Sequence, residues 1–73
     1  MAHHAVESEV AGSVWKLEVV VGDMVAMGDV LIILESMKME IPVESPAAGE
    51  VVEIRVQPED QIAEEQVLCI IRS

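Results

Sequence analysis

Apolar and polar residues alternate with a period of two along two separate stretches of the chain. The apolar positions are Trp15, Leu17, Val19 and Val21 in the first stretch and Val52, Ile54 and Val56 in the second. This period is typical of a strand that turns one face toward a core. Trp15 is therefore predicted to lie on the inner face, as a core or core-edge residue rather than a ligand-stacking one.

Two unbroken apolar runs, residues 30–34 and 67–71, have the length of strands that are buried on both faces. Turn residues precede both runs, and a third alternating segment, residues 39–44, contains Pro42, which suits an edge strand. Cys69 lies inside the second run with no internal histidine or other base beside it. We interpret it as a small core residue and not as a nucleophile.

The chain repeats itself. Residues 6–36 align without a gap on residues 43–73, with identity at 13 of the 31 aligned positions. The repeat predicts two like structural units of about eight short strands in all, closed into a small or flattened barrel with two-fold pseudosymmetry. Glu59 and Glu65 stand where the first copy has Gly22 and Gly28. Because glutamate tolerates a positive φ poorly, the turns of the second half are expected to differ in shape.

Length and charge limit the possible functions. The 73 residues make one domain, residues 1–73, in which residues 1–5 are expected to be frayed. A net charge of −10 and a single aromatic residue argue against nucleic acid and against an anionic membrane surface. No apolar run approaches the roughly 20 residues of a spanning helix. We expect a cytoplasmic, monomeric domain with no metal site, since His3 and His4 lack further ligands at a suitable spacing.

The segment between the two copies carries the candidate chemistry. It follows Glu35 and contains Met37, Lys38 and Met39, with Lys38 at the predicted hairpin tip, and a two-fold arrangement would place the chain termini at the opposite end. A lysine there points its four-carbon stem into solvent, and the flanking thioethers would give soft contact surfaces to several partners. The residues alone leave two hypotheses open: a tether for a prosthetic group, or an ordinary solvated lysine.

These residues also resemble a known family. The sequence Glu-Ser-Met-Lys-Met at residues 35–39 is similar to the Glu-Ala-Met-Lys-Met attachment motif of the biotinyl domains, the biotin carboxyl carriers of the biotinyl/lipoyl attachment family. The Gly-Asp turns before residues 30–34 and the Pro-to-Gly turn at residues 46–49 also resemble the family, and the likeness covers almost the whole chain from Val6 onward. Ser36 departs from the usual alanine, a change expected to matter little.

The resemblance implies an all-β fold, a flattened eight-stranded barrel of two four-stranded antiparallel sheets. It implies a non-catalytic carrier in which Lys38 is biotinylated by a biotin protein ligase and carries a carboxyl group from a biotin carboxylase to a carboxyltransferase. Met37, Met39 and Glu35 would then be recognised by the ligase and the partner enzymes. The alternatives are a lipoyl-type acyl carrier, whose tip is usually Asp-Lys-Ala, and an unmodified β-barrel interaction module. Which molecule accepts the carboxyl group, an acyl-CoA or another substrate, is left open by the resemblance.

Overall fold

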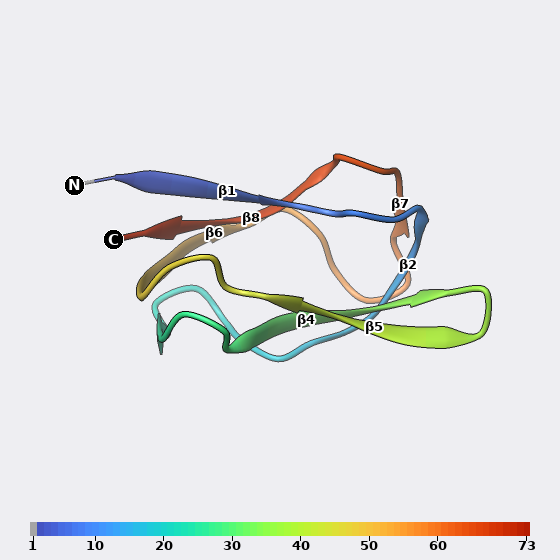
Figure 1. The fold of residues 1–73 in the computed structure, drawn as a ribbon, viewed down its shortest axis with the longest axis horizontal. Helices are drawn as coiled ribbons and strands as arrows, with labels where there is room; N and C mark the ends of the chain where they lie inside the picture. Colours follow the sequence, from blue (N-terminus) through green and yellow to red (C-terminus); the bar gives the residue numbers. More distant parts are fainter. Residues whose placement is uncertain (1) are drawn as a thin grey trace.

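The computed structural model describes residues 2–73 and folds them into two four-stranded antiparallel sheets (Figure 1). The strand order is β1-β8-β6-β3 in one sheet and β5-β4-β2-β7 in the other, and the described residues contain no helix. The predicted all-β class and the two-sheet architecture are confirmed. The strands are β1 (His3–Glu7), β2 (Gly12–Leu17), β3 (Met24–Val25), β4 (Val30–Ser36), β5 (Met39–Glu44), β6 (Gly49–Ile54), β7 (Gln61–Ile62) and β8 (Val67–Arg72).

The repeat in the sequence is a repeat in the structure. Each strand of one sheet has a counterpart in the other sheet whose number differs by four, so β1, β8, β6 and β3 correspond to β5, β4, β2 and β7. Even the irregularities match: the register shifts between Val14 and Lys16 in β2, and between Val51 and Glu53 in β6. The two halves therefore share a backbone, and any residue can be compared with its partner 37 positions away.

These two bulges correct the prediction for Trp15. Val14, not Trp15, faces the core, with 2% of its surface exposed against 46% for Trp15. A bulge adds one residue to one strand, and a shift of one residue moves every later side chain to the opposite face. The alternation holds again at Val19, which is buried, but it fails at Val21, which is 58% exposed.

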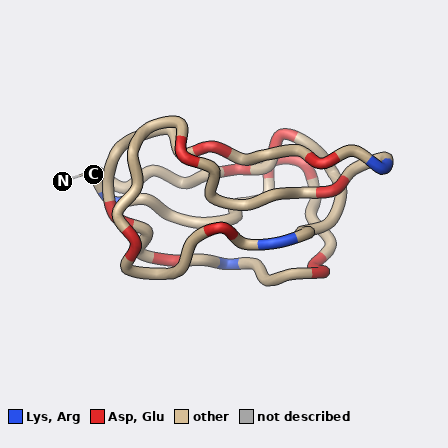
Figure 2. Tube along the Cα trace, turned by 90° about the horizontal axis from the view of Figure 1, so that it is seen from below, with Lys and Arg blue, Asp and Glu red and all other residues tan. Residues whose placement is uncertain are grey.

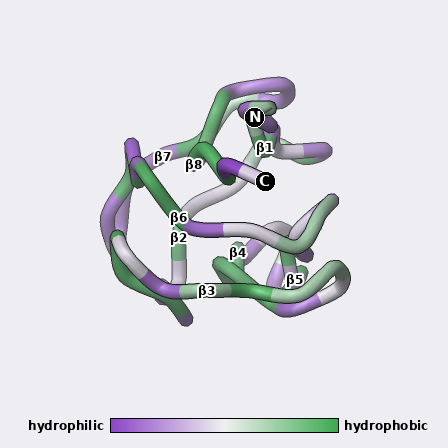
Figure 3. The backbone as a smooth tube through the Cα atoms, turned by 90° about the vertical axis from the view of Figure 1, so that its left-hand side faces the viewer, coloured by the Kyte–Doolittle hydropathy of each residue, from purple (hydrophilic) through white to green (hydrophobic). Residues whose placement is uncertain are grey.

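The central strands β4 and β8 supply the middle of the core. Their fully buried side chains are Leu31, Ile32, Leu34, Leu68, Cys69 and Ile71. Figure 3 looks along the molecule from one end and shows the strands wrapped around this interior. Pro42 lies in β5, an edge strand, as predicted. At an edge its missing N–H breaks no ladder hydrogen bond.

The turns of the second half keep the shape of those in the first, contrary to expectation. Glu59 and Glu65 have φ of 77° and 70°, beside 101° and 91° for Gly22 and Gly28. In each turn, the residue with positive φ is followed by an Asp or Gln. The side-chain oxygen of this Asp or Gln accepts a hydrogen bond from the backbone N–H of the residue three positions earlier, which closes the turn. The four bonds run from Val20 to Asp23 (3.0 Å), Ala26 to Asp29 (2.8 Å), Gln57 to Asp60 (3.0 Å) and Ala63 to Gln66 (2.9 Å). This shared bond fixes the turn whether glycine or glutamate precedes it.

The two ends of the molecule, which measures 36 × 18 × 18 Å, are different. The β4–β5 hairpin protrudes at one end and both termini lie at the other (Figure 1), as the repeat predicted. His3 to Ala5 belong to β1 and pair with β8, which differs from the frayed segment expected for residues 1–5; Met1 lies outside the described residues. Within residues 2–73, the structure has no helix long and apolar enough to span a bilayer.

Candidate functional site at the β4–β5 hairpin

The hairpin closes with a two-residue turn. Ser36 pairs with Met39, and Met37 and Lys38 between them have φ of 52° and 65°. Positive φ at both central residues is the mark of a type I′ turn, which matches the right-handed twist of the flanking strands. The tight turn predicted from the sequence is present, with Lys38 at its apex.

Solvent surrounds the side chains of the tip. Met37 is 91% exposed and Met39 is 64% exposed, and Lys38 is exposed between them. In the part of the chain that the structure describes, the three ion pairs are Lys16–Glu18, Arg55–Glu53 and Arg72–Glu50, and none includes Lys38. The amine at the apex is therefore accessible to a second protein.

Charge sets the tip apart from the body of the domain. In Figure 2 the blue segment at the protruding end is followed on both strands by red acidic positions. Glu35 and Glu40 face each other across the hairpin, and both are exposed. The hairpin thus presents one cation at the end of a domain whose net charge is −10.

Two residues that sequence reasoning undervalued fix the root of the hairpin. The Ser36 hydroxyl donates a 2.9 Å hydrogen bond to the Ala11 carbonyl, a bond that alanine could not make, so the change from alanine is not neutral in structure. A Cβ at Gly12 would collide with the carbonyl oxygen of Glu35, so glycine allows β2 to approach the hairpin closely. From the sequence, Ser36 counted only as a small residue in the place of alanine.

The rest of the described chain offers no competing chemistry. Cys69 is fully buried, and burial raises the pKa of its thiol to about 11, which keeps it protonated and unreactive at neutral pH. This confirms it as a core residue. His4 donates or accepts a 3.0 Å hydrogen bond with Ser73 at the terminal end. No group of three or more His, Cys, Asp or Glu side chains among residues 2–73 could hold a metal ion.

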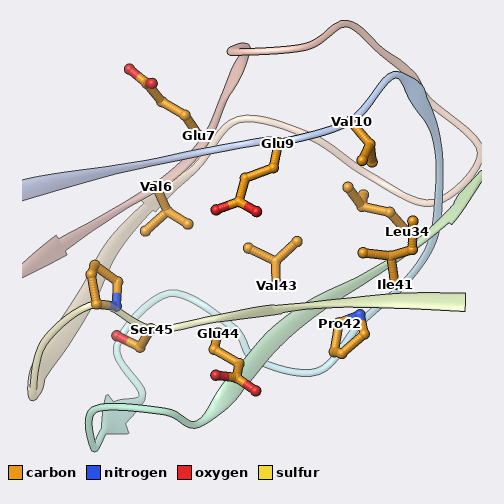
Figure 4. A pocket seen from close by; sticks show the side chains of 11 residues that line it. Val6, Glu7, Glu9, Val10, Leu34, Ile41, Pro42, Val43, Glu44 and Ser45 are labelled. Carbon is orange, nitrogen blue, oxygen red and sulfur yellow. The ribbon is translucent and has the colours of Figure 1, made fainter.

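A groove of about 480 Å³ lies between the segment after β1 and strand β5 (Figure 4). Its walls are largely apolar, with Val6, Val10 and Val43 among them, and the Glu9 carboxylate hangs into it. Ser45, a hydroxyl residue on its lining, donates its proton to the Ala47 carbonyl at 2.7 Å. The lining contains no pair of nucleophile and base of the kind a hydrolase needs.

Comparison with known proteins agrees with the geometry of the hairpin. A family model described as "Biotin-requiring enzyme", that of the biotinyl/lipoyl attachment domains, matches residues 4–71. The chain belongs to this family. Two relatives of similar length are a "Biotinylated protein TB7.3 homolog" of Mycobacterium leprae, 42% identical over 66 residues, and a "Biotin/lipoyl attachment protein" of Bacillus subtilis, 41% identical over 63 residues. The first alignment spans 90% of this chain and 93% of the relative; the second spans 86% of each.

The biotinyl/lipoyl fold also recurs inside much larger enzymes. The Kluyveromyces lactis urea carboxylase matches this chain with a TM-score of 0.93 and 32% identity, over 99% of this chain but 6% of the carboxylase. The chain is thus a biotin/lipoyl attachment domain of a type that occurs both in short proteins and within long carboxylases.

Proposed function

We propose that Lys38 is the attachment site of biotin, and that this domain carries a carboxyl group from a biotin carboxylase to a carboxyltransferase. The observation that carries the proposal is the position of Lys38. It is exposed at the apex of a two-residue turn, and it takes part in none of the ion pairs among residues 2–73. The printed name of the Mycobacterium leprae relative, a biotinylated protein, supports the same proposal.

The loading step places specific demands on Lys38. Its Nζ must lose a proton to the ligase and attack an activated acyl carbon, so that an amide bond forms as the bond to the leaving group breaks. An exposed stem with no internal partner lets the ligase surround the amine and take that proton. The biotinyl group, once bound, supplies a ureido nitrogen that can hold a carboxyl group. The rest of the chain contributes a rigid support and no catalytic group.

Met37 and Met39 are proposed as the contact surface for the ligase and the partner enzymes. Thioether side chains are unbranched and polarizable, so one pair can adapt to differently shaped surfaces. Met37 and Met39 are 91% and 64% exposed, so neither side chain contributes much to the core. An exposed apolar side chain on each side of one lysine suits contact with another protein. Glu35, on the strand below, is proposed as a further recognition residue.

A tethered carrier works through effective concentration. Once the domain docks beside an active site, delivery of its cofactor becomes a local event instead of a search through solution. The lipoyl-type carrier remains the second candidate, because one relative is named for both groups and the family includes both.

The test uses the two lysines of the chain, Lys38 and Lys16. Purified protein is incubated with a biotin protein ligase, ATP and biotin, or with a lipoate ligase, ATP and lipoate, and intact mass is measured. We expect one biotin on the wild type and on Lys16→Arg, and none on Lys38→Arg. Streptavidin should capture the first two proteins only.

Each other outcome has a clear meaning. Biotin on Lys38→Arg would overturn Lys38 as the site. A chain modified by the lipoate ligase and not by the biotin ligase is the lipoyl carrier. A chain modified by neither, although folded by circular dichroism, is an unmodified interaction module.

A further inference from the structure

A second feature of the hairpin end is a surface hollow of about 560 Å³ beside the hairpin root. Its lining includes Ser13 and Trp15 from β2, Glu35 from β4, Pro58 and Glu59 from the turn before β7, and Gln61 of β7. Ser13 is the Cα partner of Glu35, so the hollow begins on the strand that leads directly to Lys38. Trp15, the sole aromatic residue, is 46% exposed there.

The other half of the molecule shows that the fold does not require this arrangement. The residues 37 positions later than Ser13, Trp15 and Glu35 are Glu50, Val52 and Arg72. Glu50 and Arg72 form an ion pair across the surface that corresponds to the hollow. At the hairpin end a small hydroxyl and an exposed carboxylate replace that pair, and indole replaces valine, on the same backbone.

The chemistry of the hollow suits one kind of ligand. Trp15 offers a flat apolar ring, and the Lys16 ammonium lies over one of its two faces, with Nζ 4.7 Å from the ring centroid. The Glu35 carboxylate, which joins none of the ion pairs in residues 2–73, can accept N–H donors, and the Ser13 hydroxyl and Gln61 amide can donate to a carbonyl. A ring with a cyclic urea on one side and a thioether on the other carries this combination of groups.

We propose that this hollow is a resting site for the biotinyl ring that Lys38 carries between visits to partner enzymes. The inference rests on the proposed attachment of biotin to Lys38. The ring would lie against Trp15, with its urea N–H groups directed at Glu35. The active site of a partner enzyme would then compete with the hollow for the biotinyl ring. In the resting carrier, less of the ring would be exposed to solvent.

The arm is long enough to reach. Val14 pairs with Leu34 and Lys16 with Ile33, so Trp15 is level with the middle of β4, about four residues from the tip. At about 3.3 Å per residue, with one strand spacing of about 4.8 Å, the separation is about 14 Å. Eleven bonds join the lysine Cα to the ring, each advancing about 1.2–1.3 Å when extended, which also gives about 14 Å.

Because Trp15 is the sole tryptophan, its fluorescence reports on the hollow directly. The chain is loaded with biotin by its ligase, full loading is verified by intact mass, and the loaded and unloaded forms are compared. We expect loading to shift the emission to shorter wavelength and to lower the acrylamide quenching constant roughly twofold. In proton–nitrogen spectra, the Trp15 indole and the amides of Ser13 and Glu35 should shift, whereas the amides of Gly22 and Gly28 should not.

Trp15→Val, which installs the residue of the other half, provides the matched variant. When both proteins are fully loaded, streptavidin should capture Trp15→Val roughly twofold faster than the wild type, because its ring is no longer held. Unchanged fluorescence and unchanged indole and Ser13 signals in a chain of the loaded mass would overturn the resting site and leave the carrier function intact. A chain that does not load at all would overturn both.

Discussion

Glutamate occupies glycine's place in two turns, and the effect of that exchange is local to single residues. Glu59 and Glu65 adopt φ of 77° and 70°, a left-handed conformation that crowds Cβ against the following carbonyl. Their partners Gly22 and Gly28 carry no such penalty, and a Cβ there would meet no atom within 4 Å beyond the residues adjacent in the chain. The strain is therefore purely conformational.

We predict that Glu65→Gly stabilises the domain by about 0.5–1 kcal/mol. Glycine removes the strain of the left-handed conformation in the folded state, and this gain exceeds the cost of the greater conformational entropy that glycine gives the unfolded chain. The matched control is Glu64→Gly. Glu64 is exposed in the same turn and is absent from the residues with positive φ, so glycine there should destabilise by a similar amount. Thermal and urea unfolding of the three proteins measures both changes; a loss of stability in Glu65→Gly would contradict the assigned strain.

At the scale of elements, the sequence predicted the strands well and their faces less well. The strands could be predicted because the alternation of apolar and polar residues and the repeat at an offset of 37 residues are both properties of the sequence itself. The bulges between Val14 and Lys16 and between Val51 and Glu53 were not, since an extra residue in a strand leaves no compositional mark. That is why Trp15 was placed inside.

At the site too, features within a few residues of one another could be predicted, and contacts between residues far apart in the sequence could not. Lys38 and its two methionines stand out within a few residues, and their tip position follows from the repeat. The hydrogen bond from Ser36 to Ala11 joins residues 25 positions apart, and the close approach of Gly12 to Glu35 depends on the pairing of β2 with β4. Such contacts depend on the folded arrangement and not on any local pattern.

The hairpin tip combines backbone strain with the proposed attachment site. Met37 holds φ at 52°, where asparagine is better tolerated, and its thioether is almost wholly exposed. We predict that Met37→Asn raises the free energy of unfolding by about 0.5 kcal/mol and slows loading of Lys38 by the ligase several-fold. Urea unfolding and a time course of intact mass measure the two effects.

Met37→Ala separates the causes, because alanine keeps the strained φ and removes the thioether. It should load as slowly as Met37→Asn without any gain in stability. If Met37→Asn loaded at the rate of the wild type, the proposed role of Met37 as a contact for the ligase would be wrong.

At the scale of the whole molecule, charge should govern how the proposed carrier meets its partners. Fourteen acidic and four basic residues give the net charge of −10, and acidic positions are spread along the domain (Figure 2). Partners that receive the Lys38 end are then expected to present basic rims around their active sites. Attraction of this kind mainly accelerates association, and it is screened by salt.

We therefore predict that carboxyl transfer to the biotinylated domain, at concentrations below saturation, slows roughly tenfold between about 10 and 300 mM NaCl, because screening shortens the range of attraction from about 30 Å to below 8 Å. Free biotin is the control: it lacks the acidic domain, so its carboxylation by the same biotin carboxylase should change far less. The ratio of the two rates removes any effect of salt on the enzyme itself. A ratio that stays constant across the salt range would show that the acidic surface has no part in docking, and that the tip alone is recognised.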